Sequence, residues 1–292
     1  MDELIVGARA IHFAAVALLF GAPMFRLCVA PDGPDALAPT RAIALAAAVA
    51  ALLSALGWFV GVASDMAGGW SEAFTADMLG VITFDTRFGR LWIARLVLIV
   101  SIIGLSTVGR WSRGKDIALL VLSAMVTASL VGIGHGTEGP GALGPLHALA
   151  DILHLLCAAV WLGGLFCLAV VLHRALAEGG AALVRPLLLR FSRLGYGAVA
   201  LLVVSGCVNA LILVPSPDAL ITTTYGRVLS LKIGLAVLMI SLAIINRIVL
   251  APRLSTSEGA TGALWRSVVA EQSVGLLVLA TVARLGTIHP PA

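Results

Sequence analysis

Charged residues are scarce in this chain of 292 residues, because Lys, Arg, Asp and Glu together make up only 12% of it. Hydrophobic residues make up 60%, and the mean hydropathy is +1.06. A soluble domain of this size could not cover its surface with polar groups at such a composition. The apolar runs extend for about 20 residues or more without period-two alternation, as spanning helices do. We therefore predict an all-α, polytopic membrane protein solvated by lipid.

Common catalytic and metal-binding motifs are also missing. The absence of a CxxC pair excludes a disulfide framework and a zinc-finger pattern for the four cysteines, which are Cys28, Cys157, Cys167 and Cys207. There is no GxSxG, Walker or HExxH motif and no room for a soluble catalytic domain between the spans, so we do not expect an enzyme. Methionine-rich tracts typical of Cu(I) trafficking are absent. Basic loops explain the formal net charge of +4, which therefore requires no nucleic-acid partner.

Eight spanning helices are expected, over residues 4–29, 40–66, 90–109, 115–135, 146–173, 187–214, 226–250 and 265–287. The loops after the odd-numbered spans hold 12 of the 19 Lys and Arg residues. The positive-inside rule places these loops in the cytoplasm, and both termini and the acidic loop 65–85 in the periplasm. The acidic start and the long first apolar run predict a retained helix rather than a cleaved signal peptide. Six tryptophans lie mostly near span ends, as an interfacial belt requires: Trp58, Trp70, Trp92, Trp111, Trp161 and Trp265.

A weak internal repeat runs in the same order through both halves of the chain. Its matches are Phe88-Gly89-Arg90 with Tyr225-Gly226-Arg227, Arg95 with Lys232, His12 and Gly21 with His154 and Gly163, and Gly132-x-x-His135 with Gly286-x-x-His289. An even number of spans per half makes such a repeat parallel, with its pseudo-two-fold axis along the membrane normal. We predict one transmembrane domain over residues 1–292, with halves 1–140 and 141–292. Sites in repeat transporters tend to lie between the halves, so His12 and His154 are expected to meet there.

Five of the six histidines lie at or near the outer ends of the predicted spans: His12, His135, His147, His154 and His289. Imidazole suits copper, zinc and haem iron, and a titratable group at membrane depth is costly enough to need a reason. His147, Asp151 and His154 follow at i, i+4 and i+7, so they share one helix face. Asp151 is either a ligand or a carboxylate that orients an imidazole. This pattern predicts a metal site that opens outward. The alternative is histidines that hydrogen-bond to backbone or water at the interface.

Five further charged residues are candidates for a functional role: Arg90, Arg95, Arg227, Lys232 and Glu271. Arg90 and Arg227 stand where helices enter the membrane, a position where arginine can also simply extend its charged group to the membrane surface. Arg95 and Lys232 lie about 7–8 Å deeper and need a partner such as Asp151 or Asp65. Glu271 is either a proton-relay or ion-exit group, or the partner of a nearby arginine.

Several motifs taken together are similar to those of a known family. They are His12, Thr86-Arg87-Phe88-Gly89-Arg90 with Arg95, His154 before Trp161-Leu162-Gly163-Gly164, Tyr225-Gly226-Arg227 with Leu229 and Lys232, Asn246-Arg247, Glu271, and the proline-containing tail after His289. In these motifs the chain resembles the copper resistance D (CopD/PcoD) family of bacterial inner-membrane proteins over nearly its whole length. The resemblance implies a protein of the inner membrane that moves copper ions. It also implies a separate periplasmic CopC-type copper-binding protein as partner.

Two functions fit this pattern. In the first, copper from the periplasm is bound by some of the five outer histidines with Asp151, and passes inward between the halves, past Cys157, Cys207 or Glu271. In the second, the protein is a b-type haem cytochrome or membrane reductase with His12 and His154 as axial ligands. A pair of haems usually needs four deep histidines, and only two are deep here. We therefore expect copper transport.

Overall fold

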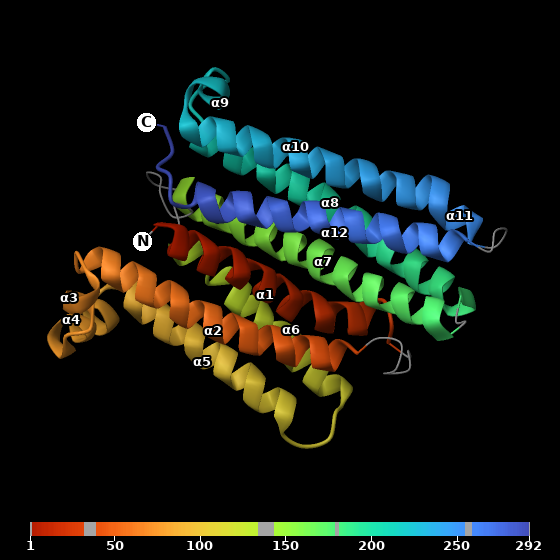
Figure 1. Ribbon diagram of the computed structural model, residues 1–292, viewed down its shortest axis with the longest axis horizontal. Coiled ribbons are helices and arrows are strands. Elements are labelled where there is room, and N and C mark those ends of the chain that lie inside the picture. The colour runs from red at the N-terminus through yellow and green to blue at the C-terminus, as the bar shows by residue number, and fades with distance from the viewer. Residues whose placement is uncertain (1, 32–38, 134–142, 179–180, 255–258, 292) are drawn as a thin grey trace.

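The computed structural model describes residues 2–31, 39–133, 143–178, 181–254 and 259–291, and helices dominate all of these ranges (Figure 1). The long helices are α1 (Asp2–Cys28), α2 (Thr40–Met66), α5 (Arg87–Thr107), α6 (Arg113–Ala128), α7 (Leu143–Glu178), α8 (Ala181–Leu213), α10 (Thr224–Ile245) and α12 (Ala260–Leu285). The short segments are α3 (Trp70–Ala73), α4 (Ala76–Gly80), η1 (Val81–Asp85), η2 (Val131–Ile133), α9 (Ala219–Thr222), η3 (Asn246–Leu250) and α11 (Ala251–Arg253). No strand occurs in these ranges, which confirms the predicted all-α class.

Seven helices in the described ranges are long and apolar enough to cross a membrane: α1, α2, α5, α7, α8, α10 and α12. The remaining long helix is α6, where the sequence predicts a span over 115–135. It has 16 residues, about 24 Å of helix, which is less than the hydrocarbon core of about 30 Å. The hydroxyls of Thr127 and Ser129 bond back to the carbonyls of Ser123 and Val126, and such bonds compete with the helical backbone near the end of α6.

Both chain ends lie at the same end of the helix bundle, together with α3, α4 and α9, whereas α11 lies at the opposite end (Figure 1). Arg9 ties the start of α1 to the end of α12, because its Nη1 donates to the carbonyl of Gly286 at 3.2 Å. Arg284 and Glu3 add an exposed ion pair across the same junction, with 3.9 Å between Nη1 and Oε1. The end with α3, α4, α9 and both termini is called the outer end below, following the predicted orientation.

Two helices, α1 and α7, form the centre of the bundle. The most apolar windows of α1 and α7 are 50% and 67% buried, against 11% for both α8 and α10. The backbones of the two central helices are in contact at Gly21 and Gly163, where a Cβ added to Gly21 would lie 2.5 Å from Gly163 Cα. Only glycine permits this distance, so the seam between α1 and α7 is tightly closed at this point.

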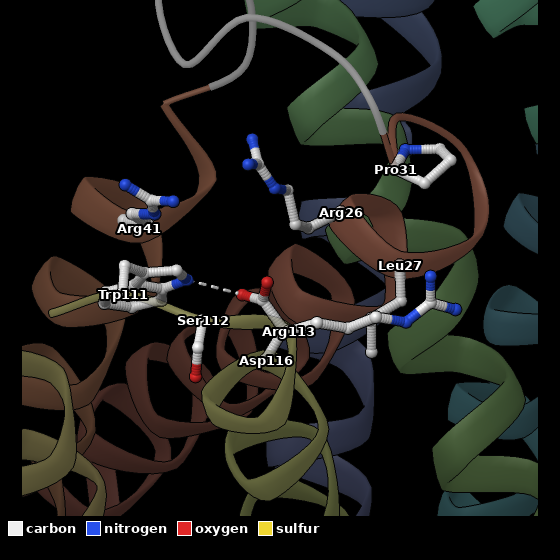
Figure 2. A pocket seen from close by; sticks show the side chains of 8 residues that line it. All are labelled: Arg26, Leu27, Pro31, Arg41, Trp111, Ser112, Arg113 and Asp116. Carbon is white, nitrogen blue, oxygen red and sulfur yellow. Dashed lines mark hydrogen bonds between the residues drawn. The ribbon is translucent and has the colours of Figure 1, made fainter.

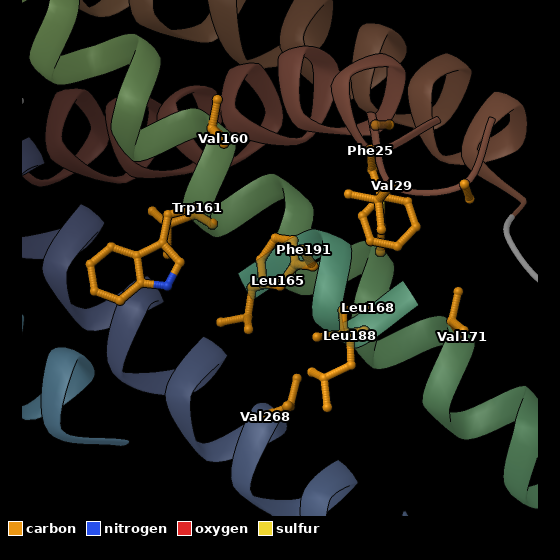
Figure 3. Close-up of a cluster of buried hydrophobic side chains, with 14 of the residues drawn as sticks. Phe25, Val29, Val160, Trp161, Leu165, Leu168, Val171, Leu188, Phe191 and Val268 are labelled. Atoms are coloured by element: carbon orange, nitrogen blue, oxygen red, sulfur yellow. The ribbon is translucent and has the colours of Figure 1, made fainter. Parts of the chain in front are cut away.

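The largest cluster of buried apolar side chains surrounds α7. Figure 3 shows Leu165 and Leu168 of α7 between Phe25 of α1 on one side and Val268 of α12 on the other. Phe25 also reaches Phe191 of α8, with 6.2 Å between the ring centroids. A second cluster fills the space between α1, α2, α5 and α6, with Leu19, Ala48, Ile99, Ile102, Leu119 and Val126 among its members. The second cluster belongs to a first group of four long helices, α1, α2, α5 and α6. The largest cluster contains residues of this group, such as Phe25 and Ala44, and joins it to a second group formed by α7, α8, α10 and α12.

Candidate functional site

The two deep histidines are held in the same way, each by the neighbouring long helix. His12 Nδ1 lies 3.1 Å from both the Ala51 carbonyl and Ser54 Oγ on α2. His154 Nδ1 lies 3.1 Å from the Leu202 carbonyl and 3.2 Å from Ser205 Oγ on α8. A carbonyl oxygen can only accept, so Nδ1 carries the hydrogen in each ring. This tautomer leaves a lone pair on Nε2, which is the form that a metal ligand needs.

The structure does not bring His12 and His154 together. Each histidine precedes the seam glycine of its helix by nine residues, about 2.5 helical turns, and therefore lies on the opposite helix face. The faces of Gly21 and Gly163 form the seam, so the two imidazoles point away from it into separate groups of helices. The expectation that they meet between the halves is therefore wrong. The haem alternative, which needs both rings on one iron, gains no support from this arrangement.

Aromatic rings and arginines surround His12. The side chain is fully buried, and its ring lies 5.7 Å from Trp58 and 6.4 Å from Trp92, centroid to centroid. The Arg95 guanidinium lies over Trp92 at 4.8 Å, and its Nε donates to Ser129 Oγ at 3.0 Å. Arg9 lies over Trp58, also at 4.8 Å. Arg95 acts electrostatically on the His12 imidazole, and Arg9 lies over a ring that contacts it. These two positive charges make the place unfavourable for a metal cation, because like charges repel strongly where water is excluded.

The surroundings of His154 are different in kind. Asp151 lies one turn away on the same face of α7, and Asn209 Nδ2 of α8 donates to its Oδ1 at 3.1 Å. His147, which is 1% exposed, and Lys232 of α10 both interact electrostatically with Asp151. Lys232 is therefore close to the carboxylate that the sequence suggests as its partner. This group combines two imidazoles, a carboxylate and an amide, with the Lys232 ammonium to balance the carboxylate.

Corresponding positions around the two histidines explain this difference. The offset of 142 residues that relates His12 to His154 also relates Ile5 to His147 and Arg9 to Asp151. A second offset, of 151 residues, relates Ser54 to Ser205, and it also relates Trp58 to Asn209. The group around His154 therefore has an imidazole, a carboxylate and an amide where the group around His12 has an alkyl chain, a cation and an indole.

No cluster of three or more His, Cys, Asp and Glu side chains that could hold a metal occurs in the described ranges. The spacing along α7 gives the reason. His147 and His154 are seven residues apart, about 10 Å along the helix axis, and Asp151 lies between them. These side chains are spaced as successive steps along one helix face and do not surround a single point.

Two further histidines and two cysteines belong to the sequence-based predictions of the copper site and path. His135 falls outside the described residues, and the exposed His289 lies after the end of α12, at the outer end. Cys207 is exposed, whereas Cys157 is buried on α7. Among the outer histidines, His147 and His154 both lie on α7 within about one turn of Asp151.

Arg90 and Arg227 are exposed at the starts of α5 and α10. Arg90 Nη1 donates to the carbonyls of Phe84 and Asp85, each at 3.1 Å. Arg227 Nη2 donates to Thr224 Oγ1 at 3.5 Å. These contacts are local to each helix start, which agrees with arginines that snorkel at the membrane surface.

The paired F/Y-G-R motifs are mainly helix starts. Thr86 and Thr223 are N-cap residues whose hydroxyls accept from the backbone N–H of Gly89 and Gly226, each at 2.9 Å. A Cβ at either glycine would clash with backbone carbonyls of the preceding turn. The sequence therefore repeats this motif because the same tight cap begins both helices.

A groove of about 380 Å³ opens on the inner half of the bundle, between α8 and α10, with α7 and α12 forming its floor. Among the described residues α2 packs against α5, but α8 packs mainly against α7, and α10 mainly against α12. In the first group of helices, α2 and α5 therefore pack together, whereas the corresponding helices of the second group, α8 and α10, leave an opening between them. The groove lining is largely apolar, with Ser192, Tyr196, Asn246, Arg247 and Glu271 as its polar members apart from Trp161.

Glu271 is the buried carboxylate of this groove, with only 2% of its surface exposed. Trp161 Nε1 donates to its Oε1 and Asn246 Nδ2 donates to its Oε2, each at 2.9 Å. Two neutral donors hold the carboxylate, and an arginine partner, one of the two alternatives from the sequence, is not among these donors. Arg247 lines the same groove but donates through Nε to Tyr196 Oη at 3.2 Å.

One face of α7 connects the outer polar group with the groove. His147, His154, Trp161 and Leu168 follow at intervals of seven residues, which is close to two turns, so they share a helix face. The first two belong to the outer group, and the last two line the groove. Trp161 is 5% exposed, and Trp58 and Trp92 are buried as well. The predicted interfacial belt is wrong for these three, because their indoles pack beside His12 or bond Glu271 inside the bundle.

Comparison with known proteins identifies the family. Residues 1–145 match the family model described as Copper resistance protein D-like, N-terminal domain, and residues 185–285 match the model described as Copper resistance protein D. The inner membrane protein YebZ of Escherichia coli (strain K12) is 31% identical over 98% of this chain and 98% of its own length. Copper resistance protein D of Pseudomonas syringae pv. tomato is 30% identical, over 99% of this chain and 97% of its own.

A third relative, the copper transport protein CutJ of Bacillus subtilis (strain 168), is 28% identical over 97% of this chain and 52% of its own length. No solved structure matches the chain. The matches cover the whole length over which the sequence motifs resemble the family, and seven candidate spans fit an inner-membrane location. The chain therefore belongs to the copper resistance protein D family and is a multi-pass protein of the inner membrane.

Proposed function

We propose that the chain transports copper across the inner membrane through its second group of four long helices, α7, α8, α10 and α12. The observation that carries this proposal is the difference between corresponding positions in the two groups. Imidazole, carboxylate and amide groups stand at His147, Asp151 and Asn209, where Ile5, Arg9 and Trp58 stand in the first group. A cation is attracted to the former set and repelled by the latter.

Copper enters at the outer end and is bound first by His147 and then by Asp151 and His154. Each imidazole offers a neutral lone pair, and Asp151 supplies the negative charge that compensates for the lost hydration of the ion. Lys232 balances Asp151 when no copper is present, which limits how tightly the ion is held. His147, Asp151 and His154 are spread along α7 and do not surround one point. This arrangement favours passage of the ion over permanent binding.

The inner half of the path is the groove between α8 and α10, with Glu271 as its carboxylate. The shared face of α7 and the opening between these helices support this route. It replaces passage between the halves, since Gly21 and Gly163 close the seam there. Cys157 lies on α7 between His154 and Trp161, which both belong to this route. Its thiol is therefore the sulfur ligand that is closest in sequence to the residues of the route.

The repeat and orientation belong to the same proposal. We infer one domain over residues 1–292, built from eight helices in two parallel halves, 1–140 and 141–292, with both termini in the periplasm. The matched hydrogen bonds of His12 and His154 and the matched caps of α5 and α10 support the repeat. The shared position of the termini supports an even number of crossings (Figure 1).

A periplasmic copper-binding protein of the CopC type is the proposed donor. It would meet the outer end, where α3, α4 and α9 lie beside the entrance to the outer polar group. Trp70, Phe74 and Phe84 are exposed in or next to these segments, and large exposed apolar side chains at one end of a protein are typical of contact surfaces.

Copper loading of purified protein tests the proposal. Wild-type protein in detergent is loaded with Cu(I), desalted and analysed for copper by mass spectrometry. We expect near-stoichiometric copper that is lost in the double variant His147→Ala/His154→Ala. The matched control is His12→Ala, which removes the other deep imidazole and is expected to retain copper. Loss of copper in the control but not in the double variant, with both proteins monodisperse, would contradict the proposed site.

A further inference from the structure

Glu271 is a buried carboxylate whose described partners are both neutral. Within the described part of the chain, the side chains that act on it are those of Trp161 and Asn246, through the hydrogen bonds given above. Arg247 lines the same groove, but its guanidinium donates to Tyr196. A charge that is removed from water is costly unless an opposite charge lies beside it. The carboxylate therefore needs one positive charge from outside this set of side chains.

The Asn246 amide presents an unpaired oxygen next to this carboxylate. Asn246 is 6% exposed, and its Oδ1 has no hydrogen-bond partner among the residues that the structure describes. Its Nδ2 donates to Glu271 Oε2 at 2.9 Å, so Oδ1, on the same amide group, also lies close to the carboxylate. Turning the amide over would place one acceptor against another. Both residues line the groove of about 380 Å³, so one ion in the groove can contact both kinds of oxygen.

The chemistry of these oxygens favours a hard ion with a single charge. Besides the carboxylate and the amide, the groove offers the hydroxyls of Ser192 and Tyr196. Oxygen ligands suit hard cations, whereas Cu(I) prefers sulfur and nitrogen. Ca²⁺ takes about six to eight oxygen ligands, and its sites use several carboxylates. The groove has one carboxylate, Glu271, which balances one positive charge.

The backbone is irregular at the same place. The α-helix α10 ends at Ile245, and the wider π-helical turn η3 begins at Asn246. Single π turns within helices are frequent at functional sites. In transporters that are built from repeats, interrupted helices bind Na⁺ or H⁺ at the interruption. The unpaired amide oxygen therefore lies where such transporters hold a monovalent cation.

Trp161, Asn246 and Glu271, called the groove cluster below, have no polar counterparts in the first group of helices. The corresponding residues are Leu19, Gly109 and Ile117, by the offsets of 142, 137 and 154 that relate the matched motifs. The cluster is therefore particular to the group of helices that contains the groove. It is not a general feature of the repeat.

We propose that the groove binds an alkali-metal cation, with the Glu271 carboxylate and Asn246 Oδ1 as ligands. Trp161 positions the carboxylate through its indole N–H. Binding of this cation does not depend on copper transport. One consequence does rest on the proposed function: where copper leaves through the groove, the two ions compete for the single carboxylate, so that only one of them is bound there at a time.

Equilibrium dialysis of the full chain in detergent against radioactive sodium, without copper, tests the proposal. Choline chloride keeps the ionic strength constant, and a mildly alkaline pH keeps competing protons scarce. We expect saturable binding of one sodium ion per chain. Glu271→Gln retains the shape of the side chain and removes its charge, and is expected to weaken sodium binding about 100-fold or more.

Two further variants separate the site from general effects on the fold. Asn246→Leu removes the amide oxygen and leaves the charge of Glu271, and is expected to weaken sodium binding about tenfold. It carries the test if Glu271→Gln is not monodisperse. The matched control is Asp116→Asn, because Asp116 is also a carboxylate that accepts from an indole, that of Trp111, as Figure 2 shows. It lies in the first group of helices, and its loss is expected to leave sodium affinity within about twofold of the wild type.

Several outcomes would overturn the proposal. Absence of saturable sodium binding in the wild type would do so in favour of a proton on Glu271. Equal binding by the wild type and Glu271→Gln, or equal losses in Glu271→Gln and Asp116→Asn, would overturn the site. Copper loading of the outer polar group is measured on separate samples of the same proteins. Failure of sodium binding with intact copper loading, or the reverse, therefore distinguishes this proposal from that of copper transport.

Discussion

Asp151→Asn isolates the charge that distinguishes the copper path from the rest of the bundle. The substitution retains the shape of the side chain and removes one negative charge. Residues three apart on a helix have side chains about 5–6 Å apart, so Asp151 lies about 6 Å from the imidazole of His154. At an effective dielectric constant of about 20, a unit charge at that distance contributes about 2.8 kcal/mol to binding of Cu(I). We expect about 100-fold weaker copper binding, with a further loss because Lys232 is left unbalanced.

A competition titration with a chromophoric Cu(I) chelator measures this change. The matched control is Asp116→Asn, because Asp116 is likewise a carboxylate that accepts a hydrogen bond from a side-chain N–H, here that of Trp111, but it lies in the first group of helices. We expect the control to bind copper as the wild type does. Copper affinity of Asp151→Asn within twofold of the wild type would refute the electrostatic reasoning.

Three further predictions concern the seam, the groove and the caps. Gly163→Ala should lower the free energy of unfolding by about 1–3 kcal/mol through overpacking, measured by thermal denaturation against Gly234→Ala, whose added Cβ meets nothing within 4 Å. Glu271→Ala leaves two buried donors unpaired, at about 1–3 kcal/mol each, and should stop copper flux while copper loading at the outer end persists. Thr223→Ala removes the cap of α10 and should cost about 1 kcal/mol without changing copper affinity; a matching loss of copper would contradict its structural role.

The class of fold could be predicted from the sequence because lipid imposes a strong pattern. Long apolar runs must be helical in a membrane, so seven of the eight expected spans reappear among the described residues as helices long and apolar enough to cross it. The length of α6 could not be predicted in this way. Its apolar pattern continues toward Ile133, but the hydroxyls of Thr127 and Ser129 bond locally near its end, and hydropathy does not register such bonds.

The burial of His12 could be predicted from its place in an apolar helix, but the pairing of the histidines could not. His12 and His154 stand at matching places in the repeat, which suggests a shared site. The nine-residue spacing to Gly21 and Gly163 already implies opposite helix faces, but the seam becomes visible only when both glycines are seen in contact. The separation of the histidines is therefore a consequence of which faces of α1 and α7 pack together.

The difference between the two groups of helices depends on contacts that the sequence alone does not align. Trp58 corresponds to Asn209 only after the hydrogen bonds of Ser54 and Ser205 fix the register of α2 and α8. The sequence does not reveal Trp161 and Asn246 as partners of Glu271 for a similar reason. Indole and amide groups in apolar helices are usually packing residues or interfacial anchors, and nothing in their spacing relates them to a carboxylate on α12.

Copper flux into proteoliposomes tests most directly whether the ion crosses through the second group of helices. Wild type, His154→Ala and His12→Ala are reconstituted at equal protein content, and copper inside the vesicles is measured over time. The account predicts that His154→Ala abolishes flux and that His12→Ala sustains it, because Arg9, Arg95, Trp58 and Trp92 exclude a cation from the first group. Flux that survives in His154→Ala and disappears in His12→Ala would contradict the account.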